Sequence, residues 1–158
     1  MIQIAPYPLW IGHGGEGYDF IHILEYGIEA VVELAFEEEP WPTRRELIAC
    51  RFPLIDGTGT RPELLVLAVR TGAALLVSEI PTLVCCGSGL SRAPAVAALA
   101  LAVKHHEPPE TSLKRLSLHH RSDVSPGLWG ELVEILPWAS GPAPLPPKSL
   151  TARNDEPI

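Results

Sequence analysis

The chain has 158 residues and a mass of 17.1 kDa; 46% of its residues are hydrophobic and 20% are charged. This size and composition are typical of one globular domain with its own buried core. Its 19 acidic residues outnumber the 12 Lys and Arg and give a formal net charge of -7. That charge argues against nucleic acid or an anionic membrane as the main partner.

The cysteines and the N-terminus favour a cytoplasmic protein. Cys50, Cys85 and Cys86 are too few and too unevenly spaced for a disulfide framework, so we expect a reducing compartment. The first residues carry no cationic stretch ahead of an apolar run, which a secretory signal would need. The longest apolar stretches, 64–77 and 93–103, are too short to span a bilayer, so we expect no membrane partner.

The first half of the chain alternates predicted strands and helices. Hydrophobic period and turn residues predict, in order, a strand at 9–11, a helix over 18–26 that stops at Gly27, a strand over 28–34, a loop over 35–42, a strand over 48–54 and a flexible connection at 56–60.

The second half continues the alternation and ends in a proline-rich segment. The same rules predict, in order, a helix from Pro62 to about Glu79, a strand over 82–85, a loop over 86–92, a central apolar helix over 93–106, and two helices over 110–119 and 126–136. Five of the eleven residues over 137–147 are proline, so we expect a folded domain at 1–138 and a disordered tail at 139–158. The alternation predicts an α/β fold whose mostly parallel central sheet is flanked by helices.

The loop over 86–92 has the properties of an anion site. It joins a strand to a strong helix, and its backbone N–H groups can point inward at the positive end of the helix dipole. Gly87 and Gly89 allow the backbone angles that such a cradle needs. Arg92, six positions after Cys86, can bind two oxygens of a tetrahedral dianion at once.

Cys86 lies at the start of this loop. Inward N–H donors and a nearby arginine stabilise a thiolate, which is a nucleophile at neutral pH and could attack phosphorus. The alternative is structural, since a buried cysteine at the end of a strand is most often a small hydrophobic residue.

The segment 84–92 resembles the Cys-x5-Arg signature of the cysteine-dependent protein tyrosine phosphatase superfamily, and its Cys-x-x-Gly-x-Ser-Arg form resembles the dual-specificity phosphatases. Segments 8–12, 24–34 and 125–129 resemble the opening strand, the helix with its following strand, and the last helix of that family. The resemblance covers residues 4–138. It implies a protein tyrosine phosphatase-like fold and hydrolysis of phosphate monoesters through a phosphocysteine, without metal or cofactor.

The resemblance also implies roles for individual residues. Cys86 is then the nucleophile, Arg92 binds the phosphoryl oxygens, and an aspartate on a mobile loop above the cradle is the general acid. The phosphate-binding residues it implies are Gly87, Ser88, Gly89, Leu90, Ser91 and Arg92. Asp56 is the candidate acid because it follows a predicted strand, is flanked by Gly57 and lies thirty positions before Cys86. The alternative for Asp56 is an ordinary Asp-Gly turn.

Two positions depart from the family pattern, which usually has His before the nucleophile and Ser or Thr after the arginine. Here these positions are Cys85 and Ala93. Without a hydroxyl at position 93, we expect slow hydrolysis of the phosphocysteine after a stoichiometric burst. The alternative is a pseudophosphatase that binds phosphorylated partners without turnover. Cys85 should point to the opposite face of its strand from Cys86 and pack in the core.

Several other patterns have weaker functional interpretations. The cysteine loop over 86–92 is also compatible with a rhodanese-like sulfur carrier. The segment 12–17 fits the glycine fingerprint of dinucleotide-binding proteins, although no second nucleotide-binding half follows. The pairs His105-His106 and His119-His120 are expected at solvated helix ends, and 37–39 in a solvated acidic loop. Because the loop over 86–92 has one cation, we expect a phosphorylated protein or a small aryl phosphate as substrate.

Overall fold

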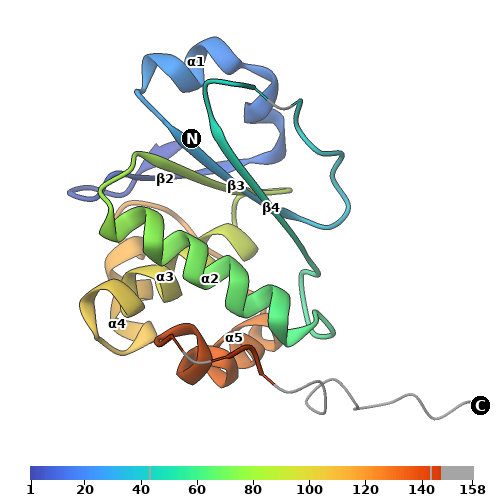
Figure 1. The fold of residues 1–158 in the computed structure, drawn as a ribbon, viewed down its shortest axis with the longest axis vertical. Helices are drawn as coiled ribbons and strands as arrows, with labels where there is room; N and C mark the ends of the chain where they lie inside the picture. The colour runs from blue at the N-terminus through green and yellow to red at the C-terminus, as the bar shows by residue number, and fades with distance from the viewer. Residues whose placement is uncertain (43, 143, 147–158) are drawn as a thin grey trace, which may run out of the picture.

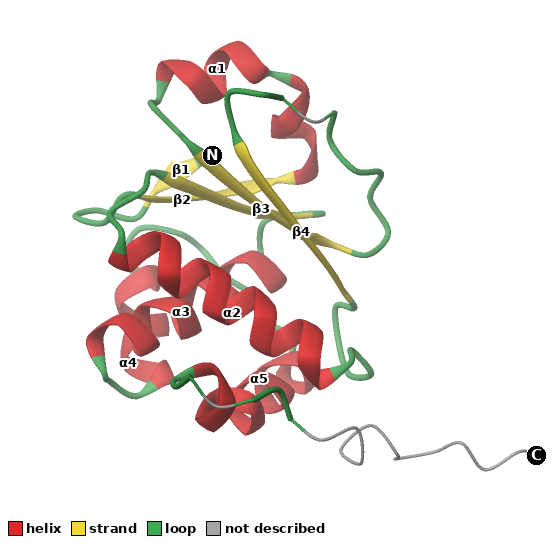
Figure 2. Ribbon diagram, viewed as in Figure 1, coloured by secondary structure: helices red, strands yellow, loops and turns green. Residues whose placement is uncertain are grey.

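The computed structural model describes residues 1–42, 44–142 and 144–146. Its five-stranded sheet has the order β1-β2-β5-β3-β4 (Figure 2). The strands are β1 (Ile2–Gln3), β2 (Leu9–His13), β3 (Ala30–Ala35), β4 (Ile48–Leu54) and β5 (Thr82–Cys86). Only β1 runs antiparallel to its neighbour; the β2/β5, β5/β3 and β3/β4 pairs are parallel. The predicted α/β fold with a mostly parallel sheet is confirmed.

Helices cover both faces of the sheet (Figure 1). One face carries the helices α2 (Pro62–Val77), α3 (Arg92–His105), α4 (Pro109–Ser117) and α5 (Pro126–Ala139). The other face carries the 3-10 turn η1 (Gly14–Tyr18) and the short helix α1 (Phe20–Glu25). The central helix α3 is buried continuously from Arg92 to Ala102, as its all-round apolar pattern predicts.

Parallel pairing brings the functional candidates to one edge of the sheet. The strands β3, β4 and β5 run in the same direction, so their carboxyl ends and the loops that follow them lie together. Cys86 ends β5, Glu37 follows β3 and Asp56 follows β4.

The predicted helix over 18–26 is shorter in the structure. The glycine-rich segment before it forms η1, in which the Gly15 N–H donates to His13 Nδ1 and the His13 N–H donates to Glu16. These local bonds, together with the flexibility of three glycines, compete with α-helix formation. The segment 12–17 is in contact with Trp41, whose indole would collide with a Cβ added at Gly17.

The last helix reaches past the expected start of the tail at residue 139. Helix α5 continues to Ala139, one residue into the expected tail, and contains Pro137. Residues 143 and 147–158 lie outside the described residues, so a disordered tail stays a prediction. None of the helices within the described part of the chain is long and apolar enough to cross a bilayer.

Candidate active site

The loop over 86–92 joins β5 to α3, and several of its carbonyls are bonded outside the loop. Three of them are hydrogen-bonded to groups outside the loop: Gly87 O to the Gly14 N–H (3.2 Å), Gly89 O to His120 Nε2 (2.8 Å) and Leu90 O to the Asp123 N–H (2.8 Å). Carbonyls bonded on the outside favour N–H groups that face the concave side, although the Leu90 N–H donates to Ser88 Oγ at 3.3 Å. This arrangement forms an anion cradle at the N-terminus of a long buried helix.

Gly89 is required by the path of the loop. Its φ is +77°, a region that favours glycine, and an added Cβ would lie 2.9 Å from the carbonyl oxygen of Gly12. A larger residue would have to push the loop away from β2.

Cys86 lies at the bottom of this cradle and is 2% exposed. Its Sγ accepts a hydrogen bond from the backbone N–H of Ala93 at 3.4 Å, in the first turn of α3. The backbone of Ala93 thus supplies one donor to the sulfur although its side chain cannot.

Arg92 is 3% exposed, and its guanidinium is hydrogen-bonded to Leu54 and Glu37. Its Nη1 donates to Leu54 O (3.0 Å) and Glu37 Oε2 (2.6 Å), and its Nη2 donates to Glu37 Oε1. Its Nε has no partner among the described residues although it is buried. The edge of the guanidinium formed by Nε and Nη2 therefore remains for a ligand with two acceptor oxygens.

Glu37 lies in an exposed loop, as expected, but it also pairs with Arg92, which the sequence did not predict. The Arg92 guanidinium, through a two-pronged hydrogen bond, lowers the pKa of Glu37 to about 2. The same contact raises the pKa of Arg92, which keeps it charged. The only sequence signal for this role was that Glu37 comes soon after the end of a buried strand.

Asp56 lies in the loop after β4, and the structure brings it to the loop over 86–92. Its Oδ1 accepts a hydrogen bond from Ser91 Oγ at 2.6 Å. The Asp56 carboxyl is exposed, and the loop around it is held by a bond from the Ile55 N–H to Thr60 Oγ1 (2.9 Å). The three predicted catalytic side chains therefore converge on one loop.

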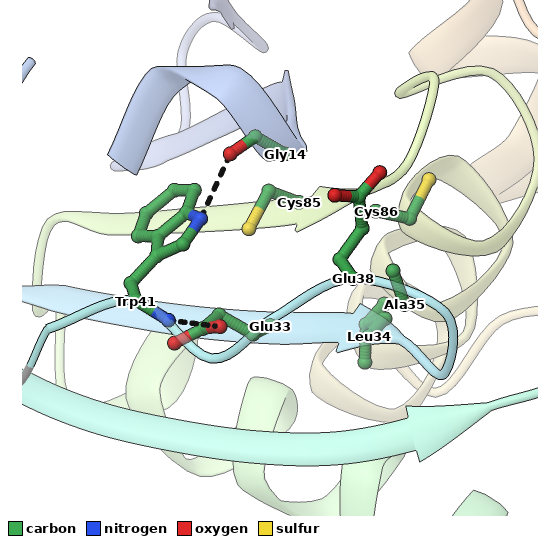
Figure 3. A pocket seen from close by; sticks show the side chains of 8 residues that line it. All are labelled: Gly14, Glu33, Leu34, Ala35, Glu38, Trp41, Cys85 and Cys86. Atoms are coloured by element: carbon green, nitrogen blue, oxygen red, sulfur yellow. Dashed lines mark hydrogen bonds between the residues drawn. The ribbon is translucent and has the colours of Figure 1, made fainter. Parts of the chain in front are cut away.

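Cys85 points away from Cys86, as expected from strand geometry. Figure 3 shows its sulfur directed towards Trp41 and the sulfur of Cys86 directed away. Cys85 is 2% exposed and its Sγ lies 3.7 Å from Val32 O. Burial, with the nearby Glu33 carboxylate, raises the pKa of Cys85 well above its usual range, so it remains a thiol. The prediction that Cys85 packs in the core is confirmed.

A pocket lies beside the cradle (Figure 3). Its lining includes Glu33, Glu38, Trp41 and both cysteines 85 and 86, but not Arg92. Trp41 is fixed there by two bonds, from its backbone N–H to Glu33 Oε2 (3.1 Å) and from its indole N–H to Gly14 O (2.8 Å).

His120 was expected at a solvated helix end, and the structure contradicts this. It is half-buried and its Nε2 is 2.8 Å from Gly89 O, so it supports the cradle. Sequence reasoning missed it because the contact joins residues 31 positions apart. Over the described ranges, no group of three His, Cys, Asp or Glu side chains is placed to hold a metal ion.

Comparisons with known proteins rest on structure. No family model and no curated protein matches the sequence. The crystal structure of human DUSP28 matches with a TM-score of 0.72 and 18% identity over 87% of this chain and 96% of that chain. A mouse putative dual specificity phosphatase complexed with zinc tungstate gives 0.72 and 19% identity over 87% and 86%.

A third structure, the human tyrosine phosphatase-like serine/threonine/tyrosine-interacting protein, gives a TM-score of 0.69 and 14% identity over 85% of this chain and 93% of that chain. These matches cover most of the described domain and most of each neighbour. The chain therefore has the α/β fold of the dual-specificity phosphatases.

Proposed function

We propose that the protein is a metal-independent phosphatase that hydrolyses phosphate monoesters on proteins, with tyrosine or dual specificity, through a phosphocysteine intermediate. The observation that carries this proposal is the pairing of two groups at one helix N-terminus. Cys86 Sγ accepts the Ala93 N–H, and the neighbouring Arg92 keeps a buried Nε without a partner among the described residues. A nucleophile and an open cationic edge in one N–H-lined loop suit a phosphoryl group.

The proposed reaction has two steps. In the first, the Cys86 thiolate attacks phosphorus, the P–O ester bond breaks, and Asp56 gives its proton to the leaving oxygen. In the second, the Asp56 carboxylate takes a proton from water, the water oxygen attacks phosphorus, and the P–S bond breaks. The Cys86 thiolate leaves in this step, and the Ala93 N–H stabilises it.

The surroundings of the loop support a phosphorylated protein side chain or a small aryl phosphate as substrate. Arg92 is the only cationic side chain in the loop, and Glu37 already pairs with it. Polyphosphorylated substrates would find little further positive charge there. Three exposed apolar side chains, Phe36, Ile55 and Leu90, come from segments in contact with Arg92 or from the loop itself. They suit a phenyl ring or a peptide more than a nucleic acid or a membrane, and we propose a cytoplasmic location.

The second candidate is a pseudophosphatase, which the lack of a hydroxyl at Ala93 favours. Such a protein would use the same cradle to bind a phosphorylated partner and would not release inorganic phosphate.

Hydrolysis of p-nitrophenyl phosphate in the presence of EDTA tests the proposal. We expect steady turnover by the wild type, none by Cys86→Ser, and wild-type rates for Cys50→Ser, which removes a thiol outside the loop. Mass spectrometry of acid-quenched protein should find one phosphoryl group on Cys86.

Turnover that survives Cys86→Ser would contradict the proposed mechanism. No turnover by the wild type, combined with vanadate binding at the loop, would support the pseudophosphatase instead.

A further inference from the structure

Ser91 connects three segments that are distant in the sequence. Its side chain is buried, with 5% of the residue exposed. Its Oγ lies 2.6 Å from Asp56 Oδ1 and 3.0 Å from the backbone N of Ser125, the N-cap residue of α5. One hydroxyl therefore joins the phosphate loop, the loop after β4 and the start of the last helix.

The partners of Ser91 determine the direction of its proton. A backbone N–H can only donate, so the Ser125 N–H uses an acceptor site on Ser91 Oγ. The single hydroxyl proton of Ser91 is then directed to Asp56 Oδ1. Because Oδ1 accepts this bond, the proton of a protonated Asp56 belongs on Oδ2, which has no hydrogen-bond partner among the described residues.

The segment that carries Asp56 is attached to α5 by further contacts. The Gly59 N–H donates to Glu131 Oε1 at 2.8 Å. Thr58 packs so closely on Gly127 that a Cβ added there would lie 2.8 Å from Thr58 Cγ2. The start of α5 thus holds both the acid loop and, through Ser125, the hydroxyl that binds Asp56.

We propose that Ser91 is a positioning residue for the general acid: through the Ser125–Ser91–Asp56 hydrogen bonds it holds the Asp56 carboxyl over the cradle with Oδ2 towards the leaving group. This inference rests on the proposed phosphatase function. It assigns the hydroxyl of Ser91 to Asp56 and leaves only its backbone N–H for the phosphate.

A comparison of two leaving groups separates this role from a general loss of structure. Protonation matters most for a poor leaving group such as phenolate and least for p-nitrophenolate. We expect Ser91→Ala to lower kcat/KM about 10-fold or more for phenyl phosphate and only about 2-fold for p-nitrophenyl phosphate. The larger loss is a fraction of the rate that general-acid catalysis supplies. In an Asp56→Asn background, the same substitution should cause no further loss on phenyl phosphate.

Ser88→Ala is the matched control because it also removes a hydroxyl from the loop. In the described structure the Ser88 hydroxyl accepts the Leu90 N–H and donates to no carboxylate. Whatever loss it causes should be equal for the two substrates. An equal loss for both substrates in Ser91→Ala would overturn the proposal while leaving the phosphatase function intact.

Amide hydrogen exchange gives a readout that needs no catalysis. Ser91→Ala should speed exchange at the Ser125 and Gly59 amides, with vanadate affinity within about 2-fold of wild type since the cradle amides remain. Unchanged exchange at Ser125 and Gly59 would overturn the connection even in an inactive protein. If the wild type shows no turnover but Ser91→Ala still speeds exchange at Ser125 and Gly59, the phosphatase function would be refuted. The Ser125–Ser91–Asp56 hydrogen bonds would still be supported.

Discussion

Glu37 binds both terminal nitrogens of Arg92, and no described residue binds the Nε of the guanidinium. Leu54 O accepts the remaining Nη1 hydrogen. The protein therefore binds the guanidinium through Nη1 and Nη2 and leaves its Nε edge for a ligand in the cradle. An arginine fixed in this way loses little side-chain entropy when a phosphoryl group binds.

Glu37→Gln should therefore weaken oxyanion binding. The amide can accept only one of the two bonds, so Arg92 loses part of its fixed orientation. We expect vanadate affinity and kcat/KM to fall about 10-fold, the scale of one charge-assisted hydrogen bond. Isothermal titration with vanadate measures the first and steady-state kinetics the second. Glu39→Gln is the control in the same acidic run; an equal loss in both variants would contradict the specific role of Glu37.

The Glu37–Arg92 pair should also make folding stability depend on pH. The pKa of Glu37 is about 2 in the folded protein against an ordinary value of 4.5, so folding favours the ionised carboxylate. Its contribution is fully present above about pH 4.5 and is lost as the pH falls towards 2. The side chain is 56% exposed, so solvent screening keeps the effect modest.

Thermal unfolding between pH 2 and pH 7 checks this dependence. The wild type should be more stable than Glu37→Gln at neutral pH, and the difference should shrink below pH 4.5. A difference in Tm that stays constant down to pH 2 would show that the carboxylate charge is not involved.

Ala93→Ser should speed the second chemical step. A hydroxyl at position 93 would add a second donor beside the Cys86 sulfur, which already accepts the backbone N–H of the same residue. We expect the wild type to give a stoichiometric burst of p-nitrophenol and a slow steady phase, and the variant a steady phase several-fold faster. Stopped-flow absorbance resolves both. Ala97→Ser, in the same buried helix, should leave the steady rate unchanged, and linear wild-type kinetics from the start would refute this account.

Gly89→Ala should damage the cradle. The positive φ of Gly89 and the contact of an added Cβ with Gly12 O predict a loss of about 1–3 kcal/mol in the free energy of unfolding, with strongly reduced vanadate binding. Gly130→Ala is the control, because a Cβ added there in α5 would meet no atom of the described residues within 4 Å. That substitution should stabilise the protein by about 0.5–1 kcal/mol. Urea unfolding of the two variants should change in opposite directions.

Cys85 should be chemically inert although it neighbours the proposed nucleophile. It is buried on the opposite face of β5, and its raised pKa keeps it protonated. Peroxide should inactivate Cys85→Ser at the wild-type rate, and peptide mapping after alkylation of the native protein should find Cys86 modified before Cys85. Slower inactivation of Cys85→Ser would assign a redox role to this thiol.

Much of the fold follows from local sequence patterns. The alternating run over 48–54 matches β4 residue for residue, and the Ala-rich helix after Arg92 is the buried α3. The strand, glycine loop and helix around Cys86 were predictable for the same reason, since turn residues and hydrophobic period act over a few positions. The glycine-rich segment 14–18 was predicted less well because its side-chain caps favour a 3-10 turn.

The contacts that complete the candidate site were decided by the tertiary structure. Arg92 meets Glu37 across 55 positions, Ser91 meets Asp56 across 35, and His120 meets Gly89 across 31. The sheet order places β5 between β2 and β3, so loops that are far apart in the chain meet at one edge. The sequence by itself determined which residue types form the anion loop, because cysteine, arginine and glycine have fixed chemistry. Only parallel strand pairing decided which carboxylate holds Arg92 and which hydroxyl holds Asp56, because those choices depend on distances in space.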